Sequence, residues 1–391
     1  MKLKTQIQLT AQCVGLSLLL TFSFQPSAVL AQGSLTPPGS PAPTMKTLAQ
    51  IEPRTPISTL PLIINAPGSY YLTANLNGIS GSSGITIVSG NVTLDLNGFT
   101  LQGVPGSVDG VFVGGTFTNV IVRNGTVTGW GAIGVDAWLS GFPRNLVFEH
   151  LTISGNGARG LYTEAGSIVR DCLFIGNAGD GIYSGGSSGG GDIAGCIARN
   201  NGGYGFSVAN GTVRQCQSEY NSTGGFNLIA SRALDCSCQN NNGDGFECLG
   251  LGDEIRKCRI VSNSGTGINC AAGNSANVVE DCEVLNNSLY GYNSGNASGN
   301  SIISRNHFSL NTVGALIIQD SNNLIEENHV VTANGVLGIE IVNAANTNNV
   351  ILKNVVIGGG LANYVNYGTA NDFGPIGSAA TATSPWANIS H

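Results

Sequence analysis

Tyrosine and carboxylate side chains recur beside regularly placed glycines in the middle of this sequence. Each lies either just before a Gly or two residues after one: Tyr162, Asp180, Tyr183, Tyr204, Asp244, Glu247 and Tyr290. Tyrosine combines an apolar ring with a polar tip, and carboxylates accept hydrogen bonds from hydroxyl groups. This mixture suits an extended glycan, so we predict a glycan-binding stripe at these seven residues. A solvated wall that binds no ligand is the alternative.

Carboxylates that could perform acid–base or metal chemistry are scattered along the chain. Asp253 and Glu254 are adjacent, but neighbours on a strand point to opposite faces. Asp180 and Asp244 share a position in a repeat, three units apart, which corresponds to about 14 Å if strands stack at about 4.8 Å. That separation is too wide for two carboxylates that flank one glycosidic bond. We therefore predict no calcium cage or cofactor, and the sequence identifies no catalytic residue.

His307 and His329 occupy equivalent positions in consecutive units, with Glu283 one unit earlier. Two imidazoles and a carboxylate could bind a transition metal or exchange protons. An exposed strand face with ordinary polar residues explains the same pattern, and on that interpretation no metal site is predicted.

A repeated motif must position all of these side chains. Six units share a cysteine, at Cys172, Cys196, Cys216, Cys236, Cys258 and Cys282. Five residues after each lies an asparagine: Asn177, Asn201, Asn221, Asn241, Asn263 and Asn287. Nine residues after each lies a glycine: Gly181, Gly205, Gly225, Gly245, Gly267 and Gly291. The spacing inside the motif is constant while the length between motifs varies, which is typical of stacked coils with variable loops on one side.

The apolar residues indicate short strands. They come in runs of two or three that alternate with polar residues, as in Ile182 and Phe206 directly after the glycines. A unit this small cannot bury its apolar face alone, so stacking must supply the core. Asn and Gly tolerate left-handed backbone angles, so we expect both at the corners, with asparagines hydrogen-bonded along the axis.

One residue before the position that the cysteine occupies in the motif, the sign of the charge alternates through six consecutive units. The six residues are Asp235, Lys257, Asp281, Arg305, Glu327 and Lys353. If the coils stack in register, each charge lies beside opposite charges. Exposed pairs contribute only about 0–1 kcal/mol each, so their predicted role is register and solubility.

The frame I-x-x-[C/N]-x-I-x-x-N-x-x-x-G-I resembles the right-handed parallel β-helix repeat of the pectin-lyase-like superfamily. The segments at 67–72 (PGSYYL) and 92–99 (VTLDLNGF) are similar to first coils of exported bacterial members. The resemblance covers residues 57–372 and implies an all-β, single-stranded right-handed solenoid of about ten to twelve coils. The superfamily contains polysaccharide lyases, hydrolases, epimerases and adhesins. Its pectate lyase calcium cluster and its polygalacturonase motifs (paired Asp, Gly-His-Gly, Arg-Ile-Lys) are absent here.

Nine cysteines remain after the export signal described next. Stacked side chains point the same way and rarely meet disulfide torsion angles, so we predict a buried ladder of free thiols. A few axial disulfides are the alternative, because exported proteins favour them.

The N-terminal segment is typical of an export signal. Lys2 and Lys4 precede an apolar run at 14–24, and cleavage is expected after Ala31, so residues 1–31 form a bacterial-type signal peptide and the protein is periplasmic or extracellular. The run is too short to span a bilayer. We predict a Pro-rich linker at 32–56, the β-helix at 57–372 and a C-terminal cap or tail at 373–391.

The amino-acid composition limits the classes of function that the protein can have. Charged residues are 10% of the chain and the net charge is −7, so no basic surface is available for nucleic acid. We predict an exported, monomeric, carbohydrate-associated protein that binds an extracellular polysaccharide and lacks a recognisable catalytic site. The alternatives are a polysaccharide lyase, epimerase or glycoside hydrolase, and a structural spacer or adhesin.

Overall fold

The computed structural model describes residues 52–138, 144–164, 166–185, 190–270, 276–295, 299–359 and 362–391. The chain divides into two compact units, Met1–Ile51 and Glu52–His391. All of the described residues belong to the second unit. The expected signal peptide and nearly all of the expected linker therefore lie outside the described residues.

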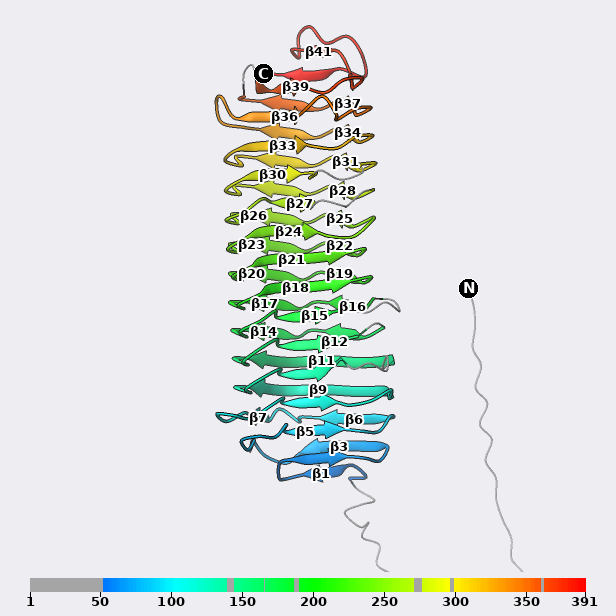
Figure 1. Cartoon of the computed structure of the whole chain (residues 1–391), viewed down its shortest axis with the longest axis vertical. Helices are drawn as coiled ribbons and strands as arrows, with labels where there is room; N and C mark the ends of the chain where they lie inside the picture. Colours follow the sequence, from blue (N-terminus) through cyan, green and yellow to red (C-terminus); the bar gives the residue numbers. More distant parts are fainter. Residues whose placement is uncertain are drawn as a thin grey trace, which may run out of the picture. The chain divides into compact units, whose positions relative to one another are not determined.

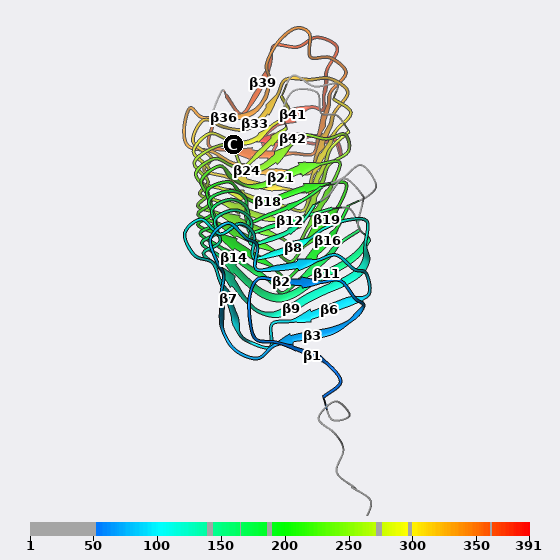
Figure 2. The ribbon, with the colours of Figure 1, turned by 60° about the horizontal axis from the view of Figure 1, so that its bottom comes forward.

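The described unit is a right-handed parallel β-helix without α-helices among its described residues, which confirms the predicted fold class. Successive turns of the chain stack one above another from β1 to β41 (Figure 1). Viewed obliquely from one end, the turns superimpose around a common interior (Figure 2). Every strand pair is parallel, for example Ile182 opposite Phe206 and Phe206 opposite Phe226.

Sheet B has 14 strands, one from each turn. They are β2 (Leu62–Ile64), β5 (Ile85–Ile87), β8 (Val111–Val113), β10 (Val135–Ala137), β12 (Leu161–Thr163), β15 (Ile182–Ser184), β18 (Tyr204–Ala209), β21 (Gly224–Ile229), β24 (Asp244–Cys248), β27 (Ile268–Cys270), β30 (Tyr290–Asn293), β33 (Gly314–Ile318), β36 (Leu337–Ile341) and β39 (Tyr364–Asn366).

Sheet A has 28 strands in two columns, joined where β9 (Thr118–Thr128) and β11 (Arg144–Ser154) run through both. The first column contains β1 (Thr55–Ile57), β3 (Gly68–Leu72), β6 (Val92–Asp95), β13 (Ile168–Arg170), β16 (Asp192–Ala194), β19 (Thr212–Arg214), β22 (Arg232–Leu234), β25 (Glu254–Arg256), β28 (Val278–Glu280), β31 (Ile302–Ser304), β34 (Leu324–Glu326), β37 (Val350–Leu352) and β40 (Asp372–Phe373).

The second column contains β4 (Leu76–Asn77), β7 (Thr100–Gln102), β14 (Leu173–Ile175), β17 (Ile197–Arg199), β20 (Gln217–Glu219), β23 (Ser237–Gln239), β26 (Arg259–Val261), β29 (Glu283–Leu285), β32 (His307–Ser309), β35 (His329–Val331), β38 (Val355–Ile357), β42 (Asn388–Ser390) and β41 (Ile376–Gly377), which pairs with β42. Strand β1 begins inside the expected linker, and β42, in the expected cap, pairs with β38.

The asparagine ladder predicted from the repeat is present. Each buried ladder asparagine donates from Nδ2 to Oδ1 of its counterpart in the next turn, as Asn221 does to Asn241 and Asn241 to Asn263, both at 3.0 Å. The ladder extends beyond the repeat, to Asn156 before it and Asn311 after it. It satisfies buried backbone groups at this corner, because the same Oδ1 atoms also accept from main-chain N–H groups.

The cysteine series lies at another corner, between the two columns of sheet A. The nine described cysteines are buried and free, as predicted. The thiols of the six cysteines in the series donate to main-chain carbonyls, for example from Cys196 Sγ to Ala194 O at 3.3 Å. After Cys282, asparagines occupy the position of the cysteine in the following turns. The N–H of Cys282 donates to Asn306 Oδ1 at 2.9 Å, and Asn328 lies in the turn after Asn306.

The expectation for the corners was wrong in one respect. The ladder asparagines and the motif glycines do not have positive φ. Left-handed backbone occurs one residue before the ladder asparagine, as at Asn240 (φ 55°), and one residue before the cysteine of the motif, as at Asp235 (φ 54°). The alternating charges therefore occupy the left-handed corner, where their side chains point outward. Two of the expected pairs form: Arg305 with Asp281 at 2.8 Å, and Lys353 with Glu327 at 3.1 Å.

The motif glycines are required by close approach between turns. A Cβ atom at Gly245 would lie 2.6 Å from the carbonyl oxygen of Gly267 and 3.0 Å from Asn263 Nδ2. The ladder asparagine and the carbonyl of the next turn thus fill the space that a side chain would need.

We expect Gly245→Ala to lower the free energy of unfolding by about 1–3 kcal/mol, because the methyl group forces the backbone of the next turn to shift. Chemical denaturation measures the change. The control is Gly176→Asn, since Gly176 (φ 62°) has open space around it and Asn240 occupies the equivalent position in another turn. Equal losses in the two variants would contradict this explanation.

Candidate functional site

The outward face of sheet B carries the predicted stripe. Tyr162 on β12 lies opposite Tyr183 on β15, and Glu247 on β24 lies further along the same row. Their neighbours point inward, where Leu161 and Ile182 are fully buried. The period-2 alternation of the strands therefore presents the stripe to solvent, while the residues before the glycines form its edge.

An aromatic cluster forms at the N-terminal end of this row. The ring of Trp138 stacks on Tyr162 with centroids 4.9 Å apart, and Tyr183 meets Tyr162 edge-on at 5.1 Å. The guanidinium of Arg159 lies 4.7 Å from the centroids of both tyrosines. Trp138 remains 43% exposed, so the cluster presents an aromatic surface to solvent.

Asp180 holds this arrangement in place. Its Oδ2 accepts from Arg159 Nε at 3.2 Å, and its Oδ1 accepts from the main-chain N–H of Tyr204 at 2.8 Å. Asp180 therefore fixes the guanidinium between the two tyrosine rings.

Asp136 lies opposite Tyr162 on the neighbouring strand β10. Burial raises the pKa of Asp136 to about 6, opposed by the hydrogen bond from the N–H of Trp138, with a further raising effect from Asp109 and a lowering effect from Arg159. Burial also raises the pKa of Tyr162. A carboxyl group that titrates near neutral pH beside an aromatic surface can accept or donate a proton.

Two other residues of the predicted stripe bind each other. The hydroxyl of Tyr204 donates to Glu247 Oε2 two turns away. The ring passes over Gly224, where an added Cβ would lie 2.9 Å from Tyr204 Cε1. Burial, followed by the hydrogen bond to Glu247, raises the pKa of Tyr204. The Tyr204 ring and its hydrogen bond to Glu247 therefore cover the middle of the stripe.

The remaining predicted residues lie apart from the aromatic cluster. Asp244 is engaged by its own sheet, because it accepts from the N–H of Thr266 at 2.6 Å and from Asn269 Nδ2 at 2.8 Å. Tyr290 lies on β30, opposite Gly314, further toward the C-terminus. The structure therefore brings together Tyr162, Tyr183 and Asp180, and leaves Asp244 and Tyr290 elsewhere.

Sequence reasoning missed Asp136, Trp138 and Arg159. They precede the six units that share a cysteine, in a part of the chain where no cysteine marks the repeat. A signal was present, because Gly134 followed by Val135 and Asp136 repeats the pattern of Gly181, Ile182 and Tyr183. Extending that frame backwards would have placed Asp136 on the stripe.

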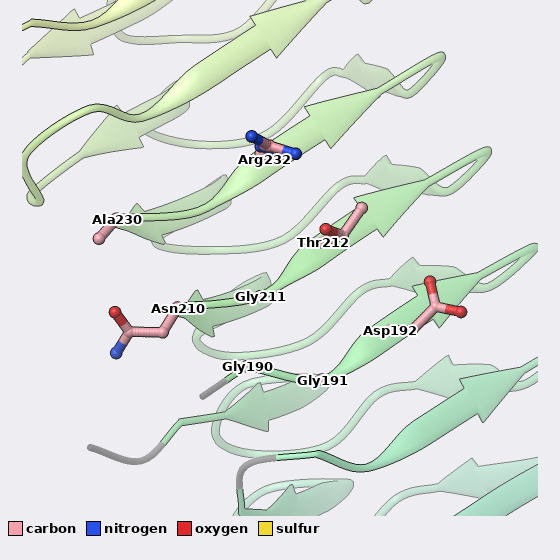
Figure 3. Close-up of a pocket in the computed structure, with 8 residues that line it drawn as sticks. All are labelled: Gly190, Gly191, Asp192, Asn210, Gly211, Thr212, Ala230 and Arg232. Atoms are coloured by element: carbon pink, nitrogen blue, oxygen red, sulfur yellow. The ribbon is translucent and has the colours of Figure 1, made fainter. Parts of the chain in front are cut away.

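The hollow drawn in Figure 3 lies elsewhere, where chain leaving sheet B enters the first column of sheet A. It has a volume of about 450 Å³ and is lined by Gly190, Gly191, Asp192, Asn210, Gly211, Thr212, Ala230 and Arg232. Its charges are neutralised within the sheet. Asp192 accepts two hydrogen bonds of 3.0 Å from Arg214, and Arg232 lies 2.9 Å from Glu254.

No group of three His, Cys, Asp or Glu side chains that could hold a metal ion occurs among the described residues. The described part of the chain also contains no helix with the length and apolar character needed to cross a bilayer.

Comparison with known proteins gives a family match over most of the chain. The family model described as "Right handed beta helix region" matches residues 83–242 and 244–371. No curated protein matches the sequence significantly.

Solved structures with similar architecture include the A-module of mannuronan C-5 epimerase AlgE6 from Azotobacter vinelandii, at 12% identity and a TM-score of 0.47, covering 86% of this chain and 90% of that one. The periplasmic alginate epimerase AlgG is similar at 12% identity and a TM-score of 0.46, covering 66% and 73%. A GH87 alpha-1,3-glucanase catalytic domain is similar at 10% identity and a TM-score of 0.43, covering 86% and 62%.

Proposed function

This chain belongs to the right-handed β-helix family, and we propose that it is an exported protein that binds an extracellular polysaccharide along sheet B. The observation that carries the proposal is the exposed cluster of Trp138, Tyr162 and Tyr183 with Arg159 held between the tyrosines. Flat rings can pack against the apolar faces of sugar rings, and adjacent polar groups can bind sugar hydroxyls.

The cluster is pre-organised for binding. Asp180 and the two tyrosine rings immobilise the guanidinium of Arg159. The main-chain N–H of Trp138 donates to the carboxylate of Asp136. A glycan that binds there does not have to order these side chains, which lowers the entropic cost of association. Further along the row Ser207 is buried, and beyond Asn227 the hydroxyl of Tyr204 engages Glu247, so the exposed binding surface is the aromatic cluster.

We expect Trp138→Ala and Tyr162→Ala each to weaken polysaccharide binding at least tenfold, because each removes part of the stacking surface. Affinity electrophoresis and calorimetry with a panel of acidic and neutral polysaccharides measure the change. The matched control is Trp386→Ala, since Trp386 is 53% exposed and packs near Lys353, away from this cluster. Absence of retardation on every polysaccharide, or equal losses in all three variants, would contradict the proposal.

Asp136 favours a second function, a polysaccharide lyase, epimerase or glycoside hydrolase acting at the same site. Its raised pKa makes it suited to proton transfer near neutral pH. If Asp136 acts as a base, turnover should rise as the pH increases through about 6, since the carboxylate is the active form. Asp136→Asn should then abolish the appearance of unsaturated products, reducing ends or epimerised sugars while the polysaccharide still binds. Turnover by Asp136→Asn at the wild-type rate would exclude this role.

Export is part of the proposal and rests on the N-terminal segment. N-terminal sequencing of the protein recovered from periplasm or medium should begin at Gln32 if cleavage follows Ala31.

A further inference from the structure

Two histidines form a stacked pair on the outer face of sheet A. His307 on β32 lies opposite His329 on β35, in the second column. Their ring centroids are 5.0 Å apart and the rings are tilted by 43°. The chain contains four histidines, so half of them are in this pair.

Both imidazoles are available as ligands. Among the described residues, neither ring has a hydrogen bond or ion pair to another side chain, whereas His150 lies 3.8 Å from Asp171. An imidazole nitrogen that is not engaged by another side chain can offer its lone pair to a metal ion.

The spacing of the rings fits one shared metal ion. A divalent ion bound about 2.0–2.1 Å from one nitrogen of each ring places the two ring centres roughly 4.5 Å apart at the right angle of a tetragonal Cu²⁺ site, and roughly 5 Å apart at a tetrahedral angle. The observed separation of 5.0 Å is close to both values. Glu283 lies next in the row, opposite His307, but Arg259 holds it at 2.9 Å. The pair alone therefore supplies two ligands, and water completes the coordination.

We propose that His307 and His329 chelate a divalent first-row transition metal ion, Cu²⁺ in preference to Ni²⁺ or Zn²⁺, at a surface site separate from the sheet B cluster. The preference for Cu²⁺ follows the usual order of affinity of nitrogen ligands for these ions. Sheet A rigidly fixes both strands, so binding requires only side-chain rotation.

Calorimetry and electron paramagnetic resonance with Cu²⁺ on the tag-free chain 32–391 test this site. We expect one Cu²⁺ with hyperfine coupling to two nitrogens, and at least tenfold weaker binding in both His307→Gln and His329→Gln. Because both side chains lie on the outer face, circular dichroism should show an unchanged fold.

The matched control is His150→Asn, which removes an exposed histidine at a left-handed position where asparagine is tolerated (φ 53°). It should bind Cu²⁺ as the wild type does. The proposal fails if either glutamine variant keeps wild-type affinity, or if the nitrogen signal persists in the double variant.

Discussion

Replacement of the ladder asparagine Asn241 by alanine is expected to lower the free energy of unfolding by roughly 2–6 kcal/mol. Asn241 is fully buried in the ladder. Its Oδ1 accepts from Asn221 N and Asn221 Nδ2, both at 3.0 Å, and its Nδ2 donates to Ser218 O at 3.1 Å. Alanine leaves the N–H of Asn221 without this acceptor, and each buried polar group that loses its partner costs about 1–3 kcal/mol.

The neighbouring residue provides the control. Asn242 is exposed, so Asn242→Ala should change stability by no more than about 0.5 kcal/mol. The midpoint of guanidinium denaturation, together with hydrogen exchange of the Asn221 amide, measures both variants. A loss below about 1 kcal/mol for Asn241→Ala would show that the ladder does not hold the turns together.

A second large effect is expected at Asp320, in the opposite direction. Asp320 is 3% exposed and follows β33, where its Oδ1 accepts from Asn323 Nδ2 at 2.6 Å. Burial raises its pKa from 3.8 to about 6, against the hydrogen bonds from Asn323 and Ser294. The folded state therefore binds the proton more tightly than the unfolded state, so the protonated form is the one that suits the fold.

The pH dependence follows from this sign. Stability is greatest below the unfolded pKa near 4 and falls as the pH rises through about 6, by at most about 3 kcal/mol for a shift of about two pKa units. Asp320→Asn should remove the contribution of Asp320 to this slope, while the contribution of Asp136, whose pKa burial also raises to about 6, remains. We expect the variant to match the wild type near pH 4 and to exceed it by up to about 3 kcal/mol at pH 8, measured by denaturation at several pH values.

Asp253 is the contrasting case. It is also buried, but its two oxygens accept from the N–H groups of Ser231 at 2.8 Å and Gly250 at 3.0 Å. Asn can accept only one of these bonds, so Asp253→Asn should destabilise the protein at pH 7. If Asp320→Asn is also less stable than the wild type at pH 8, the buried carboxylate is not the source of the slope.

The repeat in the amino-acid sequence is sufficient to specify the architecture. The constant spacing of Cys, Asn and Gly in six units, with strands of period 2 between them, required equivalent residues to stack, and the ladder of Asn221, Asn241 and Asn263 follows directly from that register. This worked because a solenoid is held together by contacts between consecutive turns, and those contacts repeat whenever the motif repeats. The same register placed Tyr162 beside Tyr183 and His307 beside His329.

The side chains that contact one another in the site could not be identified without the three-dimensional packing. The contact from Tyr204 to Glu247 skips a turn because Gly224 leaves space beneath the ring. Trp138 reaches Tyr162 from beyond the end of β10, a position that no spacing within the repeat could locate. Register fixes the height of a residue along the axis, whereas the direction of a long side chain depends on the volume left by its neighbours and on the charges beside it.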